Sequence, residues 1–341
     1  MLAGCGPERG AITAGGRIIG DNLTVYTSVP DPATGVARDM VDASKLAIAQ
    51  AGGRAGGFGI NFVAVDEGSP AHTDPPIVAA KAAERAIRDT QVIAVVGALR
   101  SDTAITSLPL FNAAGVLLVS PGAGYAGFTS AVAPGEPERW YPSGHRTFGR
   151  LIGDDREQAQ ALVAAAGDGT VAIEAEKGKA ASALADAVRA EAGDRVVEDP
   201  ARSDAVIYAG SDVDSAAAFT RQAPRATLVF PDELTRAGLA GRLTPAALRR
   251  AVFVSSAPEP GSTAELRAFE AAFEEEFGRP PDPYAVLAWQ GTRRVLDAIE
   301  AAGPRGRLRG EVAERYLALP PLPDAFRAFR IRGGERRYGS G

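Results

Sequence analysis

Strand and helix patterns alternate along most of this chain, and this alternation limits its fold more than any other feature. The strand patterns are short, continuous apolar runs such as QVIAVVGAL (91–99) and GVLLVS (115–120). The helical patterns are rich in alanine, and one of them, PPIVAAKAAERAIRD (75–89), begins with proline. Continuous apolar runs are typical of parallel strands covered on both faces. The alternation therefore predicts doubly wound α/β sheets.

The pattern runs twice, because an irregular segment rich in proline and glycine (130–150) interrupts it. Two successive series of similar size predict two similar lobes. Two long helical patterns (262–278 and 282–303) and a final strand (325–334) follow the second series. If these helices return to the first lobe, several chain crossings join the lobes and form a hinge. The predicted division is a leader remnant and tether (1–20), lobe one (21–148 with 256–326) and lobe two (149–255 with 327–341).

Composition excludes several classes of protein and site. The chain has 341 residues, enough for two domains of ordinary size. Its net charge of −5 disfavours a general nucleic-acid binder, which needs a basic surface. With two histidines and one cysteine, it lacks the residues for most zinc sites, iron–sulfur clusters and disulfide scaffolds. We therefore expect no metal and no other cofactor.

The N-terminus, MLAGCGPERG, places the only cysteine, Cys5, directly after Leu-Ala-Gly. This tetrapeptide resembles the lipobox of bacterial lipoproteins, in which the cysteine is diacylated and becomes the mature N-terminus. The basic and apolar regions that precede a lipobox are missing, so the chain as written is expected to start inside its signal peptide. A chance run of small residues is the alternative. The glycine-rich spacer after Cys5 favours a lipid anchor with a tether.

The segment GVLLVSPGAGYAGFT (115–129) contains the spacing G-x-G-x-x-G at Gly122, Gly124 and Gly127. In a dinucleotide-binding loop, this spacing joins a strand to a helix whose N-terminus receives the pyrophosphate. Here Pro121 separates the strand from the glycines, and the residues that follow have no helical period. We therefore expect no nucleotide. The glycines either let the backbone approach a small ligand or simply make a turn.

One strand earlier, VVGALRSDTA (95–104) joins a strand to a helix with Ser101 at the joint. The Ser101 hydroxyl and the free amides of the first helical turn would form an anion site suited to a carboxylate. The alternative is that Ser101 only caps the helix, and Asp102 opposes an anion unless it points to solvent. Both loops end neighbouring strands at the carboxyl edge of one sheet, where open α/β sheets bind ligands.

The segment GALRSDTAITSLPLFNAAGVLLVSPGAGYAGFT (97–129) resembles the ligand loops of type I periplasmic binding proteins of the leucine/isoleucine/valine-binding class. Other pieces similar to that family keep its order: LAIAQAGG, FVAVDEGS, FGRLIGDDREQAQAL and PDPYAVLAWQG. PERWYPSGHRTFGR resembles an actinobacterial branch of such lipoproteins. The resemblance covers nearly everything from Leu23 onward. It implies the fold of that family, with two doubly wound lobes and a hinge of several crossings.

The resemblance also implies ligand contacts. Ser101 would give its hydroxyl and amide to the ligand carboxylate, and Gly122 would give backbone contacts to the carboxylate and the ammonium. Asp232 would counter the ammonium, and its alternative role is a helix N-cap. Tyr284 would cover the ligand side chain, and its alternative role is an ordinary core aromatic. The other residues assigned to the ligand pocket are Leu99, Arg100, Ala123, Gly124, Tyr125 and Ser211.

Three of the family's contacts to amino acids are changed in this chain. Gly124 stands where a threonine hydroxyl would bind the ammonium, with Tyr125 beside it. Ser211 replaces an aromatic residue of lobe two, and Ala180 lies near the place of an expected tyrosine. A ligand larger than leucine, or one without an α-ammonium, becomes credible. Arg100 could pair a second anionic group, or it could be a solvated arginine at the lobe edge.

The implied function is that of a monomeric receptor that closes on an amino-acid-like or carboxylate ligand. It would lie outside the cytoplasm, held at the membrane through Cys5, and would deliver the ligand to the permease and ATPase subunits of an ABC importer. An enzyme is disfavoured, because Ser101 has no histidine within its motif and no pair of acids has glycosidase or metal spacing. The alternative is a sensor of the same fold that feeds a signalling partner. Neighbouring permease and ATPase genes would favour transport, and a histidine kinase gene would favour sensing.

Overall fold

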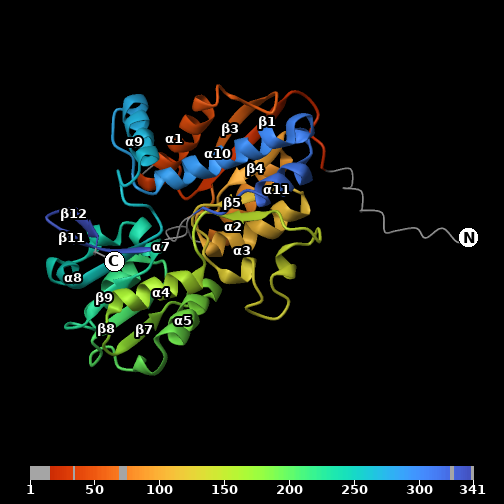
Figure 1. The fold of residues 1–341 in the computed structure, drawn as a ribbon. Coiled ribbons are helices and arrows are strands. Elements are labelled where there is room, and N and C mark those ends of the chain that lie inside the picture. Colours follow the sequence, from red (N-terminus) through yellow and green to blue (C-terminus); the bar gives the residue numbers. More distant parts are fainter. Residues whose placement is uncertain (1–15, 34, 69–74, 323–325, 339–341) are drawn as a thin grey trace, which may run out of the picture.

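The computed structural model describes residues 16–33, 35–68, 75–322 and 326–338. These residues form two lobes, each built on a sheet of six strands. In Figure 1, the red and orange part of the chain and most of the blue part make one lobe, and the green middle makes the other. The predicted fold class, two α/β lobes joined by a hinge, is confirmed. Cys5 lies outside the described residues.

The sheet of lobe one has the strand order β2-β3-β1-β4-β5-β6. Its strands are β1 (Asn22–Val29), β2 (Arg54–Ala55), β3 (Phe58–Asp66), β4 (Val92–Val96), β5 (Leu117–Ser120) and β6 (Phe148–Arg150). The neighbours run parallel except for β2, which pairs antiparallel with β3. Every residue of β4 and β5 is buried, as expected for strands covered on both faces.

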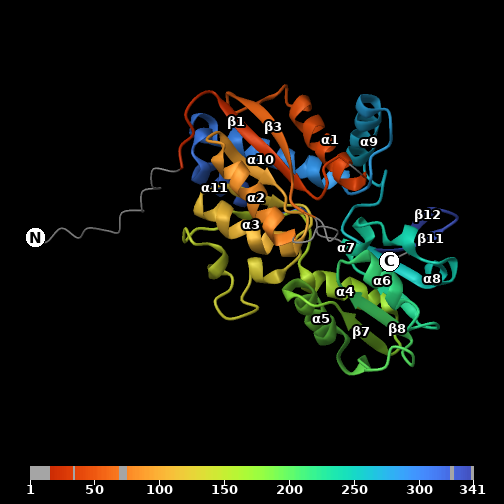
Figure 2. The ribbon, with the colours of Figure 1, turned by 180° about the vertical axis from the view of Figure 1, so that it is seen from behind.

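Helices cover both faces of this sheet (Figures 1 and 2). One face packs against α2 (Pro75–Arg88) and α3 (Ser101–Ala113). The other face packs against α1 (Gly35–Gln50), α10 (Ala285–Ala302) and α11 (Arg309–Leu317), and α9 (Ala264–Phe277) lies against α1. The helices that follow lobe two in the sequence therefore return to lobe one.

The sheet of lobe two has the order β12-β11-β10-β9-β8-β7. Its strands are β7 (Val171–Ala175), β8 (Ala205–Ala209), β9 (Thr227–Phe230), β10 (Ala251–Ser255), β11 (Arg327–Arg332) and β12 (Glu335–Tyr338). One face packs against α4 (Asp155–Ala166) and α5 (Lys179–Ala192), and the other against α6 (Val213–Phe219) and α8 (Pro245–Arg250). The first four strands are parallel, whereas β11 and β12 add antiparallel pairs at one edge.

The chain crosses between the lobes after β6, after β10 and after α11. β6 pairs with β5 of the first sheet and therefore spans the predicted lobe boundary at 148/149. Ile18 lies within the predicted tether, yet it is 1% exposed and belongs to the core of lobe one. The packed part of the chain thus begins before residue 21, and the remaining lobe boundaries stay predictions.

Two segments of lobe two are less regular than their residue patterns suggest. The segment RVVED (195–199) has the residues of a short strand, but it forms only an isolated bridge from Val196 to Val171, because two apolar residues are too few to fill a strand. The Leu/Ala-rich stretch after β9 is broken into α7 (Asp232–Arg236) and α8, with Gly238 in the left-handed conformation between them. Among the described residues, no helix is both long and apolar enough to cross a membrane.

Candidate functional site

A cleft separates the lobes where the parallel strands of both sheets end. Leu99, Arg100 and Ser101 follow β4, and Ser211 follows β8 of the opposite lobe. Leu99, Arg100 and Ser211 line a cavity of about 620 Å³. Arg100, Ser101 and Ser211 also line an adjacent cavity of about 110 Å³. The structure thus brings together four of the predicted ligand residues from the carboxyl edges of two sheets.

Arg100 spans the cleft. Its Nη2 donates to Ser211 Oγ at 3.2 Å, and its Nε donates to Asp102 Oδ1 at 2.9 Å. The guanidinium therefore already has a carboxylate partner on its own lobe. Arg100 is neither the free partner for a second anion nor the solvated edge arginine that the sequence left open.

Ser101 is the first residue of α3, and Arg100 occupies the N-cap position without a side-chain cap. The expectation of a Ser101 N-cap is therefore wrong. Ser101 Oγ instead accepts a hydrogen bond from the Tyr125 amide at 3.1 Å, which leaves its hydroxyl proton to donate to another group. Because Asp102 is paired with Arg100, its charge no longer opposes an anion at this helix N-terminus.

Glu67, which is not among the predicted site residues, positions this loop. It follows β3 and is 1% exposed. Its carboxyl group accepts from the Leu99 amide at 2.8 Å and the Thr103 hydroxyl at 3.0 Å, and burial raises its pKa to about 8. Glu67 therefore ties β3 to the start of α3 in a largely protonated state at neutral pH. An acid directly after a strand was the only signal in the sequence.

The loop after β5 makes a compact turn. Ser120 Oγ accepts from the amides of Gly122 at 3.3 Å and Ala123 at 2.8 Å. The described segment from β5 to β6 contains only three-residue 3₁₀ turns, at Ala126–Phe128 and Glu138–Trp140, so no α-helix meets the glycines. The expectation that this is not a dinucleotide loop agrees with this geometry. The Gly122 amide already has a partner within its own loop.

Gly122 lies at a close contact between the lobes. A Cβ at this position would lie 2.3 Å from Leu99 O and 2.6 Å from Arg236 Nη1. We expect Gly122→Ala to displace Arg236 and to lower the free energy of unfolding by about 2 kcal/mol, as overpacking does. Urea unfolding of the variant and the wild type measures this difference. Gly241→Ala is the control, because nothing lies within 4 Å of a Cβ there; equal losses would contradict the predicted contact.

Tyr125 lies in a buried box that joins the lobes. Its hydroxyl bonds Glu136 at 2.7 and 2.8 Å, and Lys179 Nζ of lobe two lies 2.7 Å from the same carboxylate. The Lys179 ammonium also lies 5.4 Å from the centroid of the Tyr125 ring and 5.8 Å from that of Trp140. We call Tyr125, Glu136, Trp140 and Lys179 the Glu136 box. Tyr125 therefore contributes to packing and to the contact between the lobes, and it lines neither cavity of the cleft.

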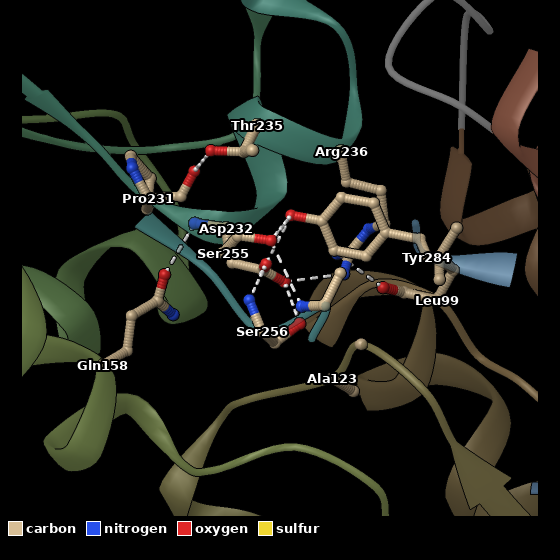
Figure 3. A network of polar contacts seen from close by, with 12 residues as sticks. Leu99, Ala123, Gln158, Pro231, Asp232, Thr235, Arg236, Ser255, Ser256 and Tyr284 are labelled. Atoms are coloured by element: carbon tan, nitrogen blue, oxygen red, sulfur yellow. Dashed lines mark hydrogen bonds and ion pairs between the residues drawn. The ribbon is translucent and has the colours of Figure 1, made fainter. Parts of the chain in front are cut away.

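Asp232 is the centre of a buried network (Figure 3). Its carboxylate accepts from Arg236 Nη1 at 2.8 Å, from the Tyr284 hydroxyl at 2.7 Å, and from the Ser256 amide and hydroxyl at 2.6 and 3.0 Å. Asp232 is 1% exposed. Because four donors already reach it, this carboxylate has little capacity left for a ligand ammonium. It also does not cap α7, whose N-cap is Pro231.

The same network joins the lobes at the hinge. Arg236 Nη2 of lobe two donates to Leu99 O of lobe one at 2.9 Å. Tyr284, just before α10, also accepts from Ser255 Oγ at 2.8 Å, where the chain leaves β10. Tyr284 is fully buried, as expected for its alternative role as a core aromatic residue. The structure therefore gives Asp232 and Tyr284 partners at the hinge, and their assignment as ligand contacts is not supported by this geometry.

Two acids outside the set of predicted ligand residues face the cleft instead. Asp155, the first residue of α4, and Glu233 of α7 both line the 110 Å³ cavity, and Glu233 also lines the larger one. The Gly124 carbonyl accepts from the Asp155 amide at 2.9 Å, and a Cβ at Gly124 would lie 3.2 Å from Asp155 Oδ1. The position where the family offers a hydroxyl thus adjoins a carboxyl group. No group of three metal-binding side chains occurs among the described residues.

The chain matches no protein-family model and no curated protein. Solved structures are similar to it. A leucine-binding protein from Thermotoga maritima has a TM-score of 0.75 at 17% identity, over 93% of this chain and 98% of that one. An ABC transporter substrate-binding protein from Desulfitobacterium hafniense, in complex with Leu, has a TM-score of 0.73 at 16% identity, over 93% and 99%.

A third similar structure is an ABC transporter solute-binding protein from R. palustris in complex with benzoate. Its TM-score is 0.72 at 18% identity, over 93% of this chain and 95% of that one. At these identities the similarity shows the fold. The chain has the fold of the type I periplasmic binding proteins, as the resemblance of its loops implied.

Proposed function

We propose that this chain is a solute-binding receptor that takes up a small amino-acid-like or carboxylate ligand between its lobes. The observation that carries the proposal is the cleft itself. Two cavities lie between the carboxyl edges of two sheets, and residues of both lobes line them. Open α/β sheets bind ligands at that edge, and lobes joined by several crossings can close over a ligand.

The similar structures support the ligand class. Their printed ligands, Leu and benzoate, share a carboxylate and an apolar body. In this chain, the N-terminus of α3 and the Ser101 hydroxyl would receive the carboxylate, since both favour an anion. Apolar side chains of the larger cavity, such as Val36, Leu99 and Val213, would cover the body of the ligand. Contacts that form only when the lobes meet would give the closed form its higher affinity.

The receptor would deliver its ligand to the permease and ATPase subunits of an ABC importer. The similar structures from Desulfitobacterium hafniense and R. palustris are named as parts of ABC transporters, which supports this partner. We further propose that the protein is a monomer outside the cytoplasm and that Cys5 carries its lipid anchor. The assignment of this chain to an actinobacterial branch belongs to the same proposal. Its role is to bind and release the ligand unchanged, without a cofactor.

A thermal-shift screen over amino acids, amides, ureas and small aromatic acids tests the receptor proposal. A ligand that binds the folded state alone raises the melting temperature by mass action. We expect at least one of these compounds to do so, and to be recovered unchanged after incubation. If a nucleotide raises the melting temperature and none of these compounds does, the proposal is wrong.

Replacing Ser101 by alanine tests the carboxylate site. With the carboxylate ligand found in the screen, we expect Ser101→Ala to weaken binding by about 1.5 kcal/mol, roughly tenfold, the low end for a hydrogen bond to a charged group. Isothermal titration calorimetry measures the change. Ser107→Ala in the same helix is the control, because its hydroxyl donates to Thr103 O within the helix. Unchanged affinity of the Ser101 variant would remove this residue from the site.

A further inference from the structure

Arginines gather at one edge of lobe two. The segments 245–255 and 326–338 contain seven arginines and one glutamate as their only charged residues, in a chain whose net charge is −5. They form α8, β10, β11 and β12. In Figures 1 and 2, α8, β11 and β12 lie together at one side of lobe two. We use the name arginine patch for five residues of this region: Arg225, Arg249, Arg330, Arg332 and Arg337.

Hydrogen bonds to the backbone join the segments that carry the patch. Arg225 lies in the loop before β9, and Arg249 lies in α8. Arg250 ties this loop to α8, because its Nη1 donates to Ala226 O at 2.5 Å. Arg332, at the end of β11, donates from Nη1 to Arg249 O at 3.3 Å. The patch is therefore one continuous surface although its residues come from distant parts of the sequence.

This surface lies at the end of the sheet opposite the cleft. The parallel strands β9 and β10 begin beside the patch, since Arg225 and Arg249 stand two residues before them. The same strands end at the other side, where Asp232 follows β9 and Ser256 follows β10 in the hinge network. A partner bound to the patch would therefore leave the cleft open to its ligand.

The charges of the patch are largely uncompensated. Within the described part of the chain, Arg337 is the only patch residue that forms an ion pair, with Glu335. Arg330 stands directly opposite Arg337 across β11 and β12, and like charges in this position destabilise a strand pair. Burial, with the positive charge of Arg332 next in size, lowers the pKa of Arg330. The fold thus holds these positive charges together at a cost in stability.

Protection of the sheet edge explains only part of this charge. β12 is the edge strand of the sheet, and charged side chains keep edge strands from pairing with other chains. Arg225 and Arg249, however, lie outside the hairpin of β11 and β12. They add positive charge where no strand edge needs protection.

The composition of this surface favours a layer of phosphate groups over a protein partner. Protein interfaces have an apolar, often aromatic centre. The exposed large apolar side chains among the described residues all belong to lobe one: Ile19, Ile77, Val132 and Leu317. The patch therefore lacks such a centre. Arginine, in contrast, binds phosphate through pairs of N–H donors.

The shape of the surface favours an extended anion over a compact one. The patch residues line neither cavity of the cleft, and four of them are exposed: Arg225, Arg249, Arg332 and Arg337. They lie on a loop, a helix and two strands and do not surround one point. A surface that carries many phosphate groups can contact all of them at once.

We propose that the arginine patch binds the phosphate headgroups of an anionic phospholipid membrane and rests lobe two on its surface. Clusters of about 4–8 basic side chains are typical of such binding. The inference goes beyond the receptor function, because it holds for any ligand of the cleft. The lipid anchor proposed at Cys5 would raise the effective concentration of the patch at the membrane. Because the contacts are electrostatic, the bound state is reversible and sensitive to salt.

Flotation with lipid vesicles tests the proposal. The full chain carries Cys5→Ser, so that no acyl chain can bind the vesicles in place of the patch. The vesicles consist of phosphatidylcholine alone or of equal parts phosphatidylcholine and phosphatidylglycerol. We expect binding to the anionic vesicles only. Its affinity should fall at least tenfold when salt rises from about 0.05 M to about 0.5 M, because screening shortens the reach of the charges.

A triple variant locates the binding on the patch. Arg249→Gln, Arg332→Gln and Arg337→Gln together remove three exposed positive charges. We expect the affinity for anionic vesicles to fall at least tenfold, since each basic side chain near the membrane contributes to binding. The melting temperature and the circular dichroism spectrum show whether the variant folds. Arg225→Gln alone, in the loop before β9, is the second variant and should weaken binding by a smaller factor.

The matched control removes the same charge from other surfaces of lobe two. It combines Arg189→Gln, Arg202→Gln and Arg242→Gln, whose side chains are exposed and paired with aspartates. We expect it to lose less than twofold in affinity. If the two triple variants lose the same affinity, the overall charge of the protein acts and the patch is not a binding surface.

Two further outcomes would overturn the proposal. The protein could fail to bind anionic vesicles at low salt. Alternatively, it could bind soluble polyglutamate through the patch and no vesicle, in which case the partner is an acidic protein. The receptor function is tested separately, because the patch lies away from the cleft. The patch variant should keep the thermal shift that a cleft ligand produces in the wild type.

Discussion

Replacing Asp232 by alanine will lower the free energy of unfolding by about 3–5 kcal/mol, the cost of breaking a buried ion pair on one side. The variant leaves the Arg236 guanidinium, which is 4% exposed, without its carboxylate. It also removes the acceptor of the Tyr284 hydroxyl and of the Ser256 amide. Urea unfolding followed by circular dichroism measures the loss. The comparison holds when the unfolding free energies of the two proteins fall with urea concentration at the same slope.

Asp214→Ala is the matched control for this effect. Asp214 also pairs with an arginine of lobe two, Arg242, but the two side chains are 78% and 61% exposed. Exposed pairs contribute about 0–1 kcal/mol, so the control should lose little. If the two variants lose equal stability, the Asp232 network does not hold the hinge as the structure indicates. If Asp232→Ala folds with normal stability and loses ligand affinity, the role that the resemblance gave Asp232 was right.

The fold class could be predicted from the alternation of apolar runs and helical periods, because both patterns are visible in a single sequence. It correctly predicted β4, β5 and the helices that cover them. The sequence did not indicate β6, because three residues beside a Pro- and Gly-rich segment have no period. The short antiparallel strands β2 and β12 were missed for a related reason, whereas β11 lies within the predicted final strand (325–334). They add to sheets whose parallel centre is already complete.

The site was predictable only as far as topology fixes it. The loops after β4 and β5 had to meet at one edge of the sheet, and Arg100 and Ser101 do line the cleft. Which acid after β9 faces the cleft depends on one turn of the short helix α7. That turn directs Asp232 to the hinge and Glu233 to the cavities, and neither residue pattern nor spacing indicates the difference. The carboxylate partners of Asp232 include Ser256 and Tyr284, which lie far from it in the sequence.

Replacing Lys179 by methionine will open the cleft of the unliganded protein. In the closed arrangement, the Lys179 ammonium balances Glu136, whose side chain is 0% exposed. Without it, the carboxylate stays buried beside the Tyr125 hydroxyl and without a cation. We expect a cost of about 3 kcal/mol to the closed arrangement, the lower end for buried pairs because Lys179 is itself partly exposed. That is roughly a 100-fold shift toward open lobes, seen as a larger radius of gyration in small-angle X-ray scattering.

The pH dependence of the wild type distinguishes the charge of Glu136 from mere packing of the lysine stem. Burial alone would raise the pKa of Glu136, but the bonds from Lys179 and Tyr125 outweigh it and lower that pKa below its ordinary 4.5. A lowered pKa stabilises the closed arrangement at neutral pH, and this contribution is lost as the pH falls through the lowered value. The wild type should therefore open in acid, while Lys179→Met is open throughout. Lys177→Met, two residues away with an exposed side chain, should behave like the wild type. If both lysine variants have the same radius of gyration as the wild type at pH 7, the Glu136 box does not hold the lobes together.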